Sequence, residues 1–257
     1  GDRIYSPINF KHFEKKNQSS DLYKKFNIIN YYAKFLIENF NEGFVTLDHF
    51  TQDLRPFFWF NFDNKKKIFL IDEVRYTSII KLQDTFKFLS IDQLIYSSLF
   101  NKFSRSIKQQ LRSKLNSKFK FIEEFNFDFA IETITMIYNR QKRNVDFDII
   151  NLKKIYQTLH KKRLIKMFIT YEEGEKIAFS IFGVVKDRAI YLNGGRTKET
   201  NDDYSLTYNL AMSIIELGIK GARTIDLEGV NSPNRSFWKL GFGGDLLPYY
   251  KISMKKN

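Results

Sequence analysis

The pattern of apolar and polar positions is clearest in the C-terminal third of the chain. Mostly apolar runs of strand length, separated by short polar turns, predict an antiparallel meander of three strands, over 164–171, 176–185 and 188–192. Apolar residues at helical spacing then predict a helix over 204–217, which ends before Gly218. A strand over 224–227, a short helix over 232–240 and a last strand over 249–254 complete this region.

Upstream of this region the pattern is less regular, but it gives the same kinds of element. Strands are expected near 68–71, 76–82 and 119–125, and helices near 21–39, 91–100, 103–115, 127–143 and 148–162. Asp148 and Ser232 are the side chains expected to cap two of the helices. This order of elements predicts an α+β fold with a mixed, mostly antiparallel sheet flanked by helices.

Two upstream segments have an unusual composition. Residues 54–60 are almost entirely apolar, and the pattern allows either a core position or one wall of a substrate cleft. Residues 103–115 have apolar side chains at every fourth position and a cationic opposite face. That face is either a solvated surface or a docking surface for phosphates.

The overall composition limits the chemistry that the chain can perform. The 257 residues carry a formal net charge of +13, which attracts nucleic acid, anionic membranes and phosphate-bearing cofactors. The absence of cysteine excludes disulfides and thiolate metal sites, and His12, His49 and His160 lack the spacing of metal ligands. No apolar run approaches the ~20 residues of a membrane span, and no secretory signal pattern is found. We therefore expect a cytoplasmic protein with no metal site and no membrane span.

Several segments of the C-terminal third follow one another in the order found in a known family. They are the turn and strand entry at 174–178, the strand end at 191–195, the helix at 206–218 and the strand exit at 226–229. Residues 238–243 resemble the family's F-K-x-x-F-G signature, with Trp238 in the first aromatic place and Lys239 after it. Over about residues 68–255 the chain resembles the Fem-type branch of the GNAT acyltransferase superfamily, which contains peptidyltransferase-like and acetyltransferase members.

This resemblance implies two GNAT-like halves, a reduced N-terminal one over 1–115 and an acyltransferase half over 116–257. It also implies an N-acyltransferase that moves an acyl group, in particular acetyl, from acyl-CoA to an amine. The acceptor is expected to be small or nucleotide-linked, such as an amino sugar or cell-envelope precursor. The lack of the coiled-coil arm that some relatives use with tRNA favours acyl-CoA as the donor.

Three alternatives stay open at this point. The first is a Fem-type peptidyltransferase that takes its acyl group from aminoacyl-tRNA. The second is a non-enzymatic basic module that binds nucleic acid, because segments rich in Phe and Lys can stack bases and hold phosphates. The third is a degenerate GNAT fold retained as a scaffold.

Acyl transfer needs a cation or donor at the developing oxyanion and benefits from a base that removes the amine proton. The resemblance gives the first role to Lys239, which matches the signature lysine. The base candidates are the acids at the strand exit and in the preceding loop: Glu228, Asp226, Asp202 and Asp203.

Binding residues are expected in two further places. A loop that breaks the third strand and leads into a helix could hold the pyrophosphate of coenzyme A on backbone amides. Its expected contacts are Asn193, Gly194, Gly195 and Arg196. The substrate, including the anionic part of a nucleotide-linked acceptor, is expected to contact Arg105, Lys108, Arg112 and Trp238.

Overall fold

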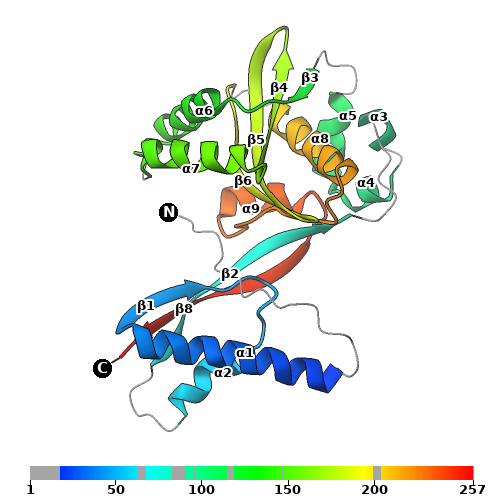
Figure 1. Ribbon diagram of the computed structural model, residues 1–257. Helices are drawn as coiled ribbons and strands as arrows, with labels where there is room; N and C mark the ends of the chain where they lie inside the picture. The colour runs from blue at the N-terminus through cyan, green and yellow to red at the C-terminus, as the bar shows by residue number, and fades with distance from the viewer. Residues whose placement is uncertain are drawn as a thin grey trace. The chain divides into compact units, whose positions relative to one another are not determined.

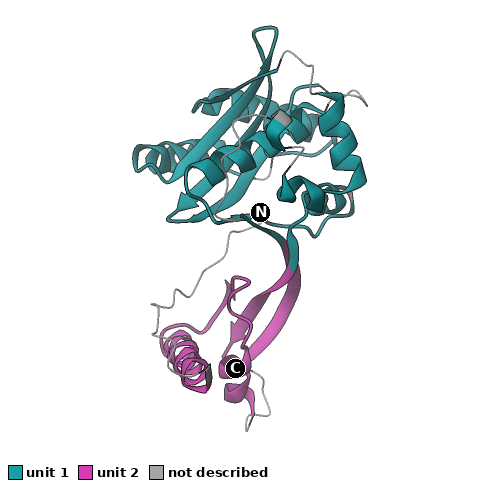
Figure 2. Ribbon diagram, turned by 90° about the vertical axis from the view of Figure 1, so that its right-hand side faces the viewer, with its two compact units in different colours: residues 1, 78–246 teal, residues 2–77, 247–257 magenta. Residues whose placement is uncertain are grey.

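The structure is a computed structural model that describes residues 18–62, 68–82, 91–94, 97–114, 119–145, 147–198 and 204–256. The chain divides into two compact units (Figure 2). Unit 1 comprises residues 78–246, and unit 2 comprises the described residues before 78 and after 246. Two strands contribute residues to both units: β2 (Phe69–Lys81) and β8 (Asp245–Lys255). The predicted boundary at 115/116 is a different kind of division, because it separates two expected copies of one fold. It stays a prediction.

Within unit 1, the sheet has the strand order β2-β7-β6-β5-β4-β3 (Figure 1). The strands are β3 (Phe119–Glu123), β4 (Ile165–Glu172), β5 (Glu175–Val185), β6 (Arg188–Arg196) and β7 (Thr224–Asp226), with the last residues of β2. Neighbouring strands pair antiparallel except β6 and β7, which are parallel. The predicted meander and the predicted α+β class are therefore confirmed.

Helices cover both faces of this sheet (Figure 1). The helices of unit 1 are α3 (Ile91–Leu94), α4 (Ser98–Lys102), α5 (Arg105–Ser113), α6 (Phe127–Arg140), α7 (Ile149–Lys161), α8 (Ser205–Ile219) and α9 (Pro233–Leu240). Met167 and Phe179 belong to a core with α6 and α7, whereas Phe168 and Phe182 belong to a core with α5 and α8. Because both faces are buried, β4 and β5 are nearly continuous apolar runs and not alternating ones.

Short polar side chains stand at the starts of these helices. Asp148 Oδ1 accepts a hydrogen bond from the Asn151 amide at 3.0 Å, so the predicted cap of α7 is confirmed. Ser232 occupies the N-cap position of α9 but makes no side-chain cap hydrogen bond, and Pro233 follows at the first helical position. The helix expected over 91–100 is present as two shorter helices, α3 and α4.

Residues 193–196 are not the loop that the sequence suggested, because they are the last four residues of β6 and pair with β5. The glycines mark close packing and not a turn. A Cβ atom on Gly195 would lie 2.8 Å from Ile137 Cδ1 of α6, and one on Gly194 would lie 2.0 Å from the Tyr191 hydroxyl. The register shifts between Ile181 and Phe182 of β5, which leaves Leu192 as the extra residue of a β-bulge in β6.

The described residues of unit 2 form three strands and the helices that pack on them. β1 (Glu42–Thr46) pairs antiparallel with β8, and β8 neighbours β2. α1 (Gln18–Asn39), α2 (Arg55–Phe58) and the 3₁₀ helix η1 (Trp59–Asn61) complete it. The apolar segment 54–60 is partly core and partly surface, because Phe57 is fully buried and Trp59 is 58% exposed. None of the described helices is long and apolar enough to cross a membrane.

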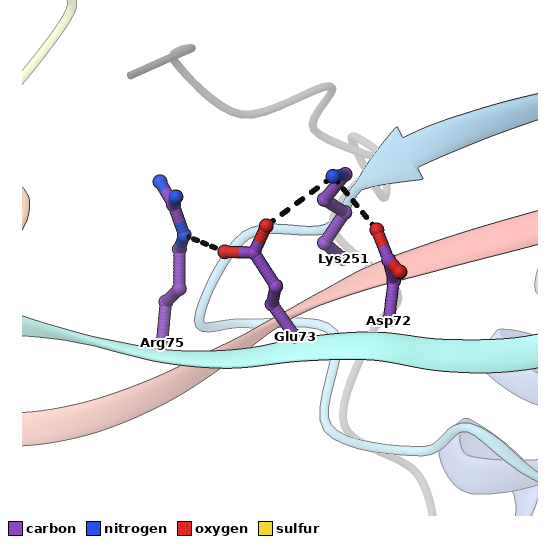
Figure 3. A network of polar contacts seen from close by, with 4 residues as sticks. All are labelled: Asp72, Glu73, Arg75 and Lys251. Atoms are coloured by element: carbon purple, nitrogen blue, oxygen red, sulfur yellow. Dashed lines mark hydrogen bonds and ion pairs between the residues drawn. The ribbon is translucent and has the colours of Figure 1, made fainter. Parts of the chain in front are cut away.

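Polar side chains join β8 to β2 in this unit (Figure 3). The Lys251 ammonium lies 2.7 Å from an Asp72 carboxylate oxygen and 3.3 Å from Glu73 Oε1. Glu73 also pairs with the Arg75 guanidinium at 2.5 Å. Hydrogen bonds from Arg75 and then Lys251 lower the pKa of Glu73. Because all four side chains are at least partly exposed, we expect each of these ion pairs to add little stability.

Candidate active site

The two parallel strands of unit 1 separate partway along β6. Their pairing runs from Arg188↔Thr224 to Ile190↔Asp226 and then stops, while β6 continues to Arg196. Beyond this point no described residue of β7 pairs with residues 191–195. A strand edge without a neighbour has free backbone N–H and C=O groups, so an extended ligand can pair there.

Lys239 reaches this separation from α9. Its ammonium donates to the Glu228 carbonyl oxygen at 3.0 Å and to the Gly229 carbonyl oxygen at 3.4 Å. The same ammonium lies 5.1 Å from the centre of the Tyr191 ring on β6, which is a cation–π distance. The lysine therefore connects β6 to the turn that follows β7, at the place where the two strands part.

The turn after β7 is held by Asp226. Its Oδ1 accepts a hydrogen bond from the Glu228 amide at 2.7 Å, and the side chain is buried. Glu228 has a left-handed backbone, with φ 50°, which costs a non-glycine residue about 1 kcal/mol. The bond from Asp226 helps to keep this conformation, and with it the two carbonyl groups that bind Lys239. Of the two acids at the strand exit, Asp226 is therefore the one that holds the turn in place.

Tyr191 supplies the ring beneath the Lys239 ammonium. It is nearly fully buried, and burial raises its pKa, while the positive charge of Arg235 acts in the opposite direction. Its hydroxyl occupies the space that a side chain on Gly194 would fill. Gly194 is thus required by the position of Tyr191, which explains a glycine in the middle of a paired strand.

A second polar pair involves the other core of the sheet. Asn193 Nδ2 donates to the Tyr156 hydroxyl of α7 at 2.8 Å, and Tyr156 is buried. Burial raises the pKa of Tyr156, the hydrogen bond from Asn193 lowers it, and the charge of Glu228 raises it again. The Glu228 carboxylate therefore acts electrostatically on this pair. Sequence reasoning missed Tyr156, because nothing local distinguishes it from the other 13 tyrosines.

Three of the four residues expected to bind substrate come together on one face of α5. Arg105, Lys108, Gln109 and Arg112 line a cavity of about 480 Å³. The Lys108 ammonium donates to the Asn101 carbonyl oxygen at 3.0 Å. Residues 97–114 contain no acidic side chain. This cavity is suited to an anionic group.

The fourth, Trp238, is part of a hydrogen-bond chain between α9 and α5. Its indole Nε1 donates to Thr207 Oγ1 of α8 at 3.0 Å, and the Thr207 hydroxyl donates to Gln110 Oε1 of α5 at 2.7 Å. Trp238 also packs edge-on against Phe242 with ring centres 5.4 Å apart. The side chain is half-buried, and these contacts place α9, and hence Lys239, relative to the α5 cavity.

The remaining predicted residues are placed as follows. Gly194 and Gly195 lie in β6 and do not start a helix, and Arg196 ends the strand opposite Ala178. Asp202 and Asp203 lie outside the described residues. Within the described parts of the chain, no group of three or more His, Cys, Asp or Glu side chains is arranged to hold a metal ion.

Known proteins resemble this chain in structure and not in sequence. No protein-family model matches the sequence, and no curated protein matches it. The structure is similar to FemX, with a TM-score of 0.64 and 14% identity over 93% of this chain and 78% of FemX.

Two further structures are similar to it. One is a conserved protein of unknown function from Bacteroides thetaiotaomicron, with a TM-score of 0.55 and 13% identity over 90% of this chain and 75% of that one. The other is L-PGS from Bacillus licheniformis, with a TM-score of 0.51 and 11% identity over 82% and 67%. The predicted likeness to Fem-type proteins is confirmed for the fold, and identities this low show the fold alone.

Proposed function

From the fold that this chain shares with FemX, we propose that it is an N-acyltransferase. In this proposal it moves an acyl group, in particular acetyl, from acyl-CoA to the amine of an amino sugar or cell-envelope precursor in the cytoplasm. The observation that carries the proposal is the Lys239 ammonium, which lies where β6 and β7 separate and is held by two carbonyl groups and an aromatic ring.

Lys239 is proposed to stabilise the oxyanion. When the amine nitrogen attacks the thioester carbonyl carbon, a C–N bond forms and negative charge develops on the carbonyl oxygen before the C–S bond breaks. An ammonium has three N–H donors. The carbonyl groups of Glu228 and Gly229 accept hydrogen bonds from it and so hold the positive charge at the place where β6 and β7 separate. Removing one such donor typically slows turnover by about 10²–10³-fold.

The acyl donor is proposed to lie along the edge of β6 beyond Ile190, where the pairing with β7 ends. Coenzyme A presents its thioester on an extended chain with amide groups, and a free strand edge can hydrogen-bond such a chain. The residues that fit this role are those beyond Ile190, including the predicted contacts at 193–196. The chain lacks the Q/R-x-x-G-x-G/A loop of most GNAT enzymes, so we assign the pyrophosphate no particular residue.

The amine is proposed to bind on the side of Tyr156 and Asn193. With its Nδ2 donating to Tyr156, Asn193 retains Oδ1 as an acceptor for an amine N–H. Glu228 is proposed to take the proton that the amine loses as the C–N bond forms, because its carboxylate is close enough to influence Tyr156. Asp226 then supports Glu228 through the turn.

The cavity on α5 is proposed to hold the anionic part of the acceptor, such as the diphosphate of a nucleotide-linked sugar. One guanidinium group can donate two parallel hydrogen bonds to the oxygens of a phosphate. Arg105 and Arg112 both line the cavity. The same cations favour one alternative donor, because aminoacyl-tRNA also presents phosphates to a run of residues without acids. Fem-type transfer from aminoacyl-tRNA is therefore the second candidate.

A melting panel followed by turnover tests these assignments. Acetyl-CoA, longer acyl-CoAs, nucleotide sugars and charged tRNA are added separately, and a ligand at about 100 times its Kd stabilises the folded state by about 2.7 kcal/mol. We expect at least one acyl-CoA to raise the Tm. Free thiol release in the presence of amines then measures transfer.

The variant Lys239→Met should keep the shift with acyl-CoA and lose about 10²–10³-fold in turnover. Lys154→Met, an exposed lysine of α7, is the matched control and should behave like the wild type. A rise in Tm with charged tRNA alone would make aminoacyl-tRNA the acyl donor in place of acyl-CoA. Equal turnover in Lys239→Met and Lys154→Met would remove Lys239 from the chemistry.

A further inference from the structure

Arg235 is a second cation on the face of α9 that carries Lys239. The two residues are four positions apart, so they are neighbours on one face of the helix, with Cβ atoms about 5–6 Å apart. The Lys239 ammonium lies over the Tyr191 ring, and the hydroxyl of that ring lies against Gly194. Burial raises the pKa of Tyr191 and the positive charge of Arg235 lowers it, so the guanidinium acts on the same tyrosine. Both cations therefore belong to the place where β6 and β7 separate.

The position of Arg235 is electrostatically unfavourable. It lies in the first turn of α9, where the partial positive charge of the helix end disfavours a cation. Like charges four residues apart on a helix also repel each other. The first turn holds no acidic side chain, the guanidinium is exposed, and no carboxylate of the described residues forms an ion pair with it. A residue that breaks local rules without a structural gain is expected where function needs it.

An anion with two oxygens would supply the missing charge. A guanidinium group can donate two parallel hydrogen bonds to a carboxylate or a phosphate, and such charge-assisted bonds are about twice as strong as neutral ones. Because Arg235 is one helical turn from Lys239, about 5.4 Å along the axis, this anion lies close to the oxyanion proposed at Lys239. The pyrophosphate of coenzyme A does not fit this place, because the whole pantetheine arm separates it from the thioester. A carboxylate a few bonds from the reacting atoms does fit.

We propose that Arg235 binds a carboxylate of the reactants, a few bonds from the atoms that form the new C–N bond. In the acceptor, such a carboxylate beside the amine is the mark of an amino acid. The proposal rests on the acyl transfer proposed above and narrows its acceptor to amines with a neighbouring carboxylate. The other source of the same group is an acyl chain that itself carries a carboxylate, such as succinyl.

Binding of matched ligands tests this without any transfer step. Each α-amino acid is compared with its carboxamide, which keeps the amine and the side chain and lacks the negative charge. In a Trp59→Phe background, the fluorescence of Trp238 reports binding, because Trp238 lies on α9 between Arg235 and Lys239. We expect at least one amino acid to bind about 10–100-fold more tightly than its carboxamide, as for a hydrogen-bonded charged group.

The variant Arg235→Met removes the guanidinium, and the preference for the carboxylate should disappear with it. Arg163→Met is the matched control, because Arg163 is an exposed arginine that follows the C-terminal end of α7, and it should keep the preference.

The melting temperature without ligand gives a second readout. Arg235→Met should raise the Tm by about 1–4 °C at low salt, because it removes a cation from a helix start, and salt should reduce this gain. Arg163 lies at a helix end that favours a cation, so Arg163→Met should not raise the Tm. A lower Tm of Arg235→Met would contradict the unfavourable placement from which the proposal starts.

The same titration with succinyl-CoA and acetyl-CoA distinguishes the two sources of the carboxylate. A preference for succinyl-CoA that depends on Arg235, in place of the amino-acid preference, would assign the carboxylate to the acyl group. Equal binding within both ligand pairs, or a preference that survives Arg235→Met, would overturn the proposal. A preference that depends on Arg235, without thiol release from any acyl-CoA, would overturn the acyl transfer and leave the carboxylate site standing.

Discussion

The substitution Gly194→Ala tests the packing of the candidate site most directly. A methyl group on Gly194 would lie 2.0 Å from the Tyr191 hydroxyl oxygen and 2.8 Å from Cζ. Tyr191 is buried, so its ring must shift to make room. Overpacking of this kind costs about 2–3 kcal/mol, and the preference of a strand for alanine over glycine returns about 0.5–1 kcal/mol. We expect a net loss of about 1–2.5 kcal/mol, equal to about 2–10 °C in Tm for a unit of this size.

The assay follows urea unfolding by the fluorescence of Trp238. The chain has two tryptophans, and Trp59→Phe leaves only the one in unit 1. The control is Gly183→Ala on the neighbouring strand, where a Cβ atom would meet only Leu192 side-chain atoms at 3.6 Å or more. This change should leave the stability of the parent unchanged or raise it by up to about 1 kcal/mol.

A second substitution isolates the cause of the loss. Tyr191→Phe removes the oxygen at 2.0 Å and keeps the ring carbon at 2.8 Å, so it should recover about half of the penalty when combined with Gly194→Ala. A penalty that Tyr191→Phe leaves unchanged, or a Gly194→Ala variant as stable as Gly183→Ala, would refute the placement of Tyr191 over Gly194. The position of Lys239 on that ring would be refuted with it.

Two further changes test unit 1 away from the site. Burial tends to raise the pKa of Glu123, but hydrogen bonds and ion pairs with Lys166 and Lys220 outweigh it and hold the pKa below 4.5. The stabilisation is present above the unfolded pKa and is lost as the pH falls through the lower folded one, so Glu123→Gln should flatten the loss of Tm between about pH 5 and 3. Gly243→Ala places a methyl group 2.6 Å from the Lys102 carbonyl oxygen at a backbone φ of +75°, and it should cost about 2–4 kcal/mol in urea unfolding.

Each of these has a matched comparison. An acid titration of Tm that is equally steep in Glu123→Gln and the wild type would show that the ion pairs of Glu123 do not contribute. For Gly243→Ala the comparison is Gly43→Ala on β1, where a Cβ atom would meet nothing within 4 Å and φ is not positive. Equal stability of the two alanine variants would contradict the close approach of Gly243 to Lys102.

Periodicity predicted most of the elements of unit 1, because the apolar runs and the turn residues are local properties of the sequence. The meander over 164–192 and the order of helix, strand, short helix and strand after it are examples. The strands expected at 68–71 and 76–82 are one strand, β2, and the error at 193–196 came from reading two glycines as a turn. In the structure both glycines lie in β6. They are glycines because Tyr191 and the side chains of α6 leave no room for a Cβ atom.

The site was only partly predictable, for a similar reason. Lys239 was predicted from a signature of neighbouring residues, Glu228 from its place at a strand exit, and the basic face of α5 from its spacing, and their roles stay predictions. Tyr156 gave no signal, since its partner Asn193 is 37 residues away and meets it only when α7 packs on the sheet. Trp238 was expected to bind substrate, which stays a prediction. The structure adds that it bonds to Thr207 of α8, which in turn bonds to Gln110 of α5.

The sequence by itself determined where strands and helices form and which lysine follows the signature, because both depend on residues close together in the chain. The tertiary structure decided where β6 and β7 part, which side chain lies over Gly194, and which carbonyl groups hold Lys239. These depend on atoms that come together only when distant elements pack, and packing at this density fixes them to within fractions of an ångström.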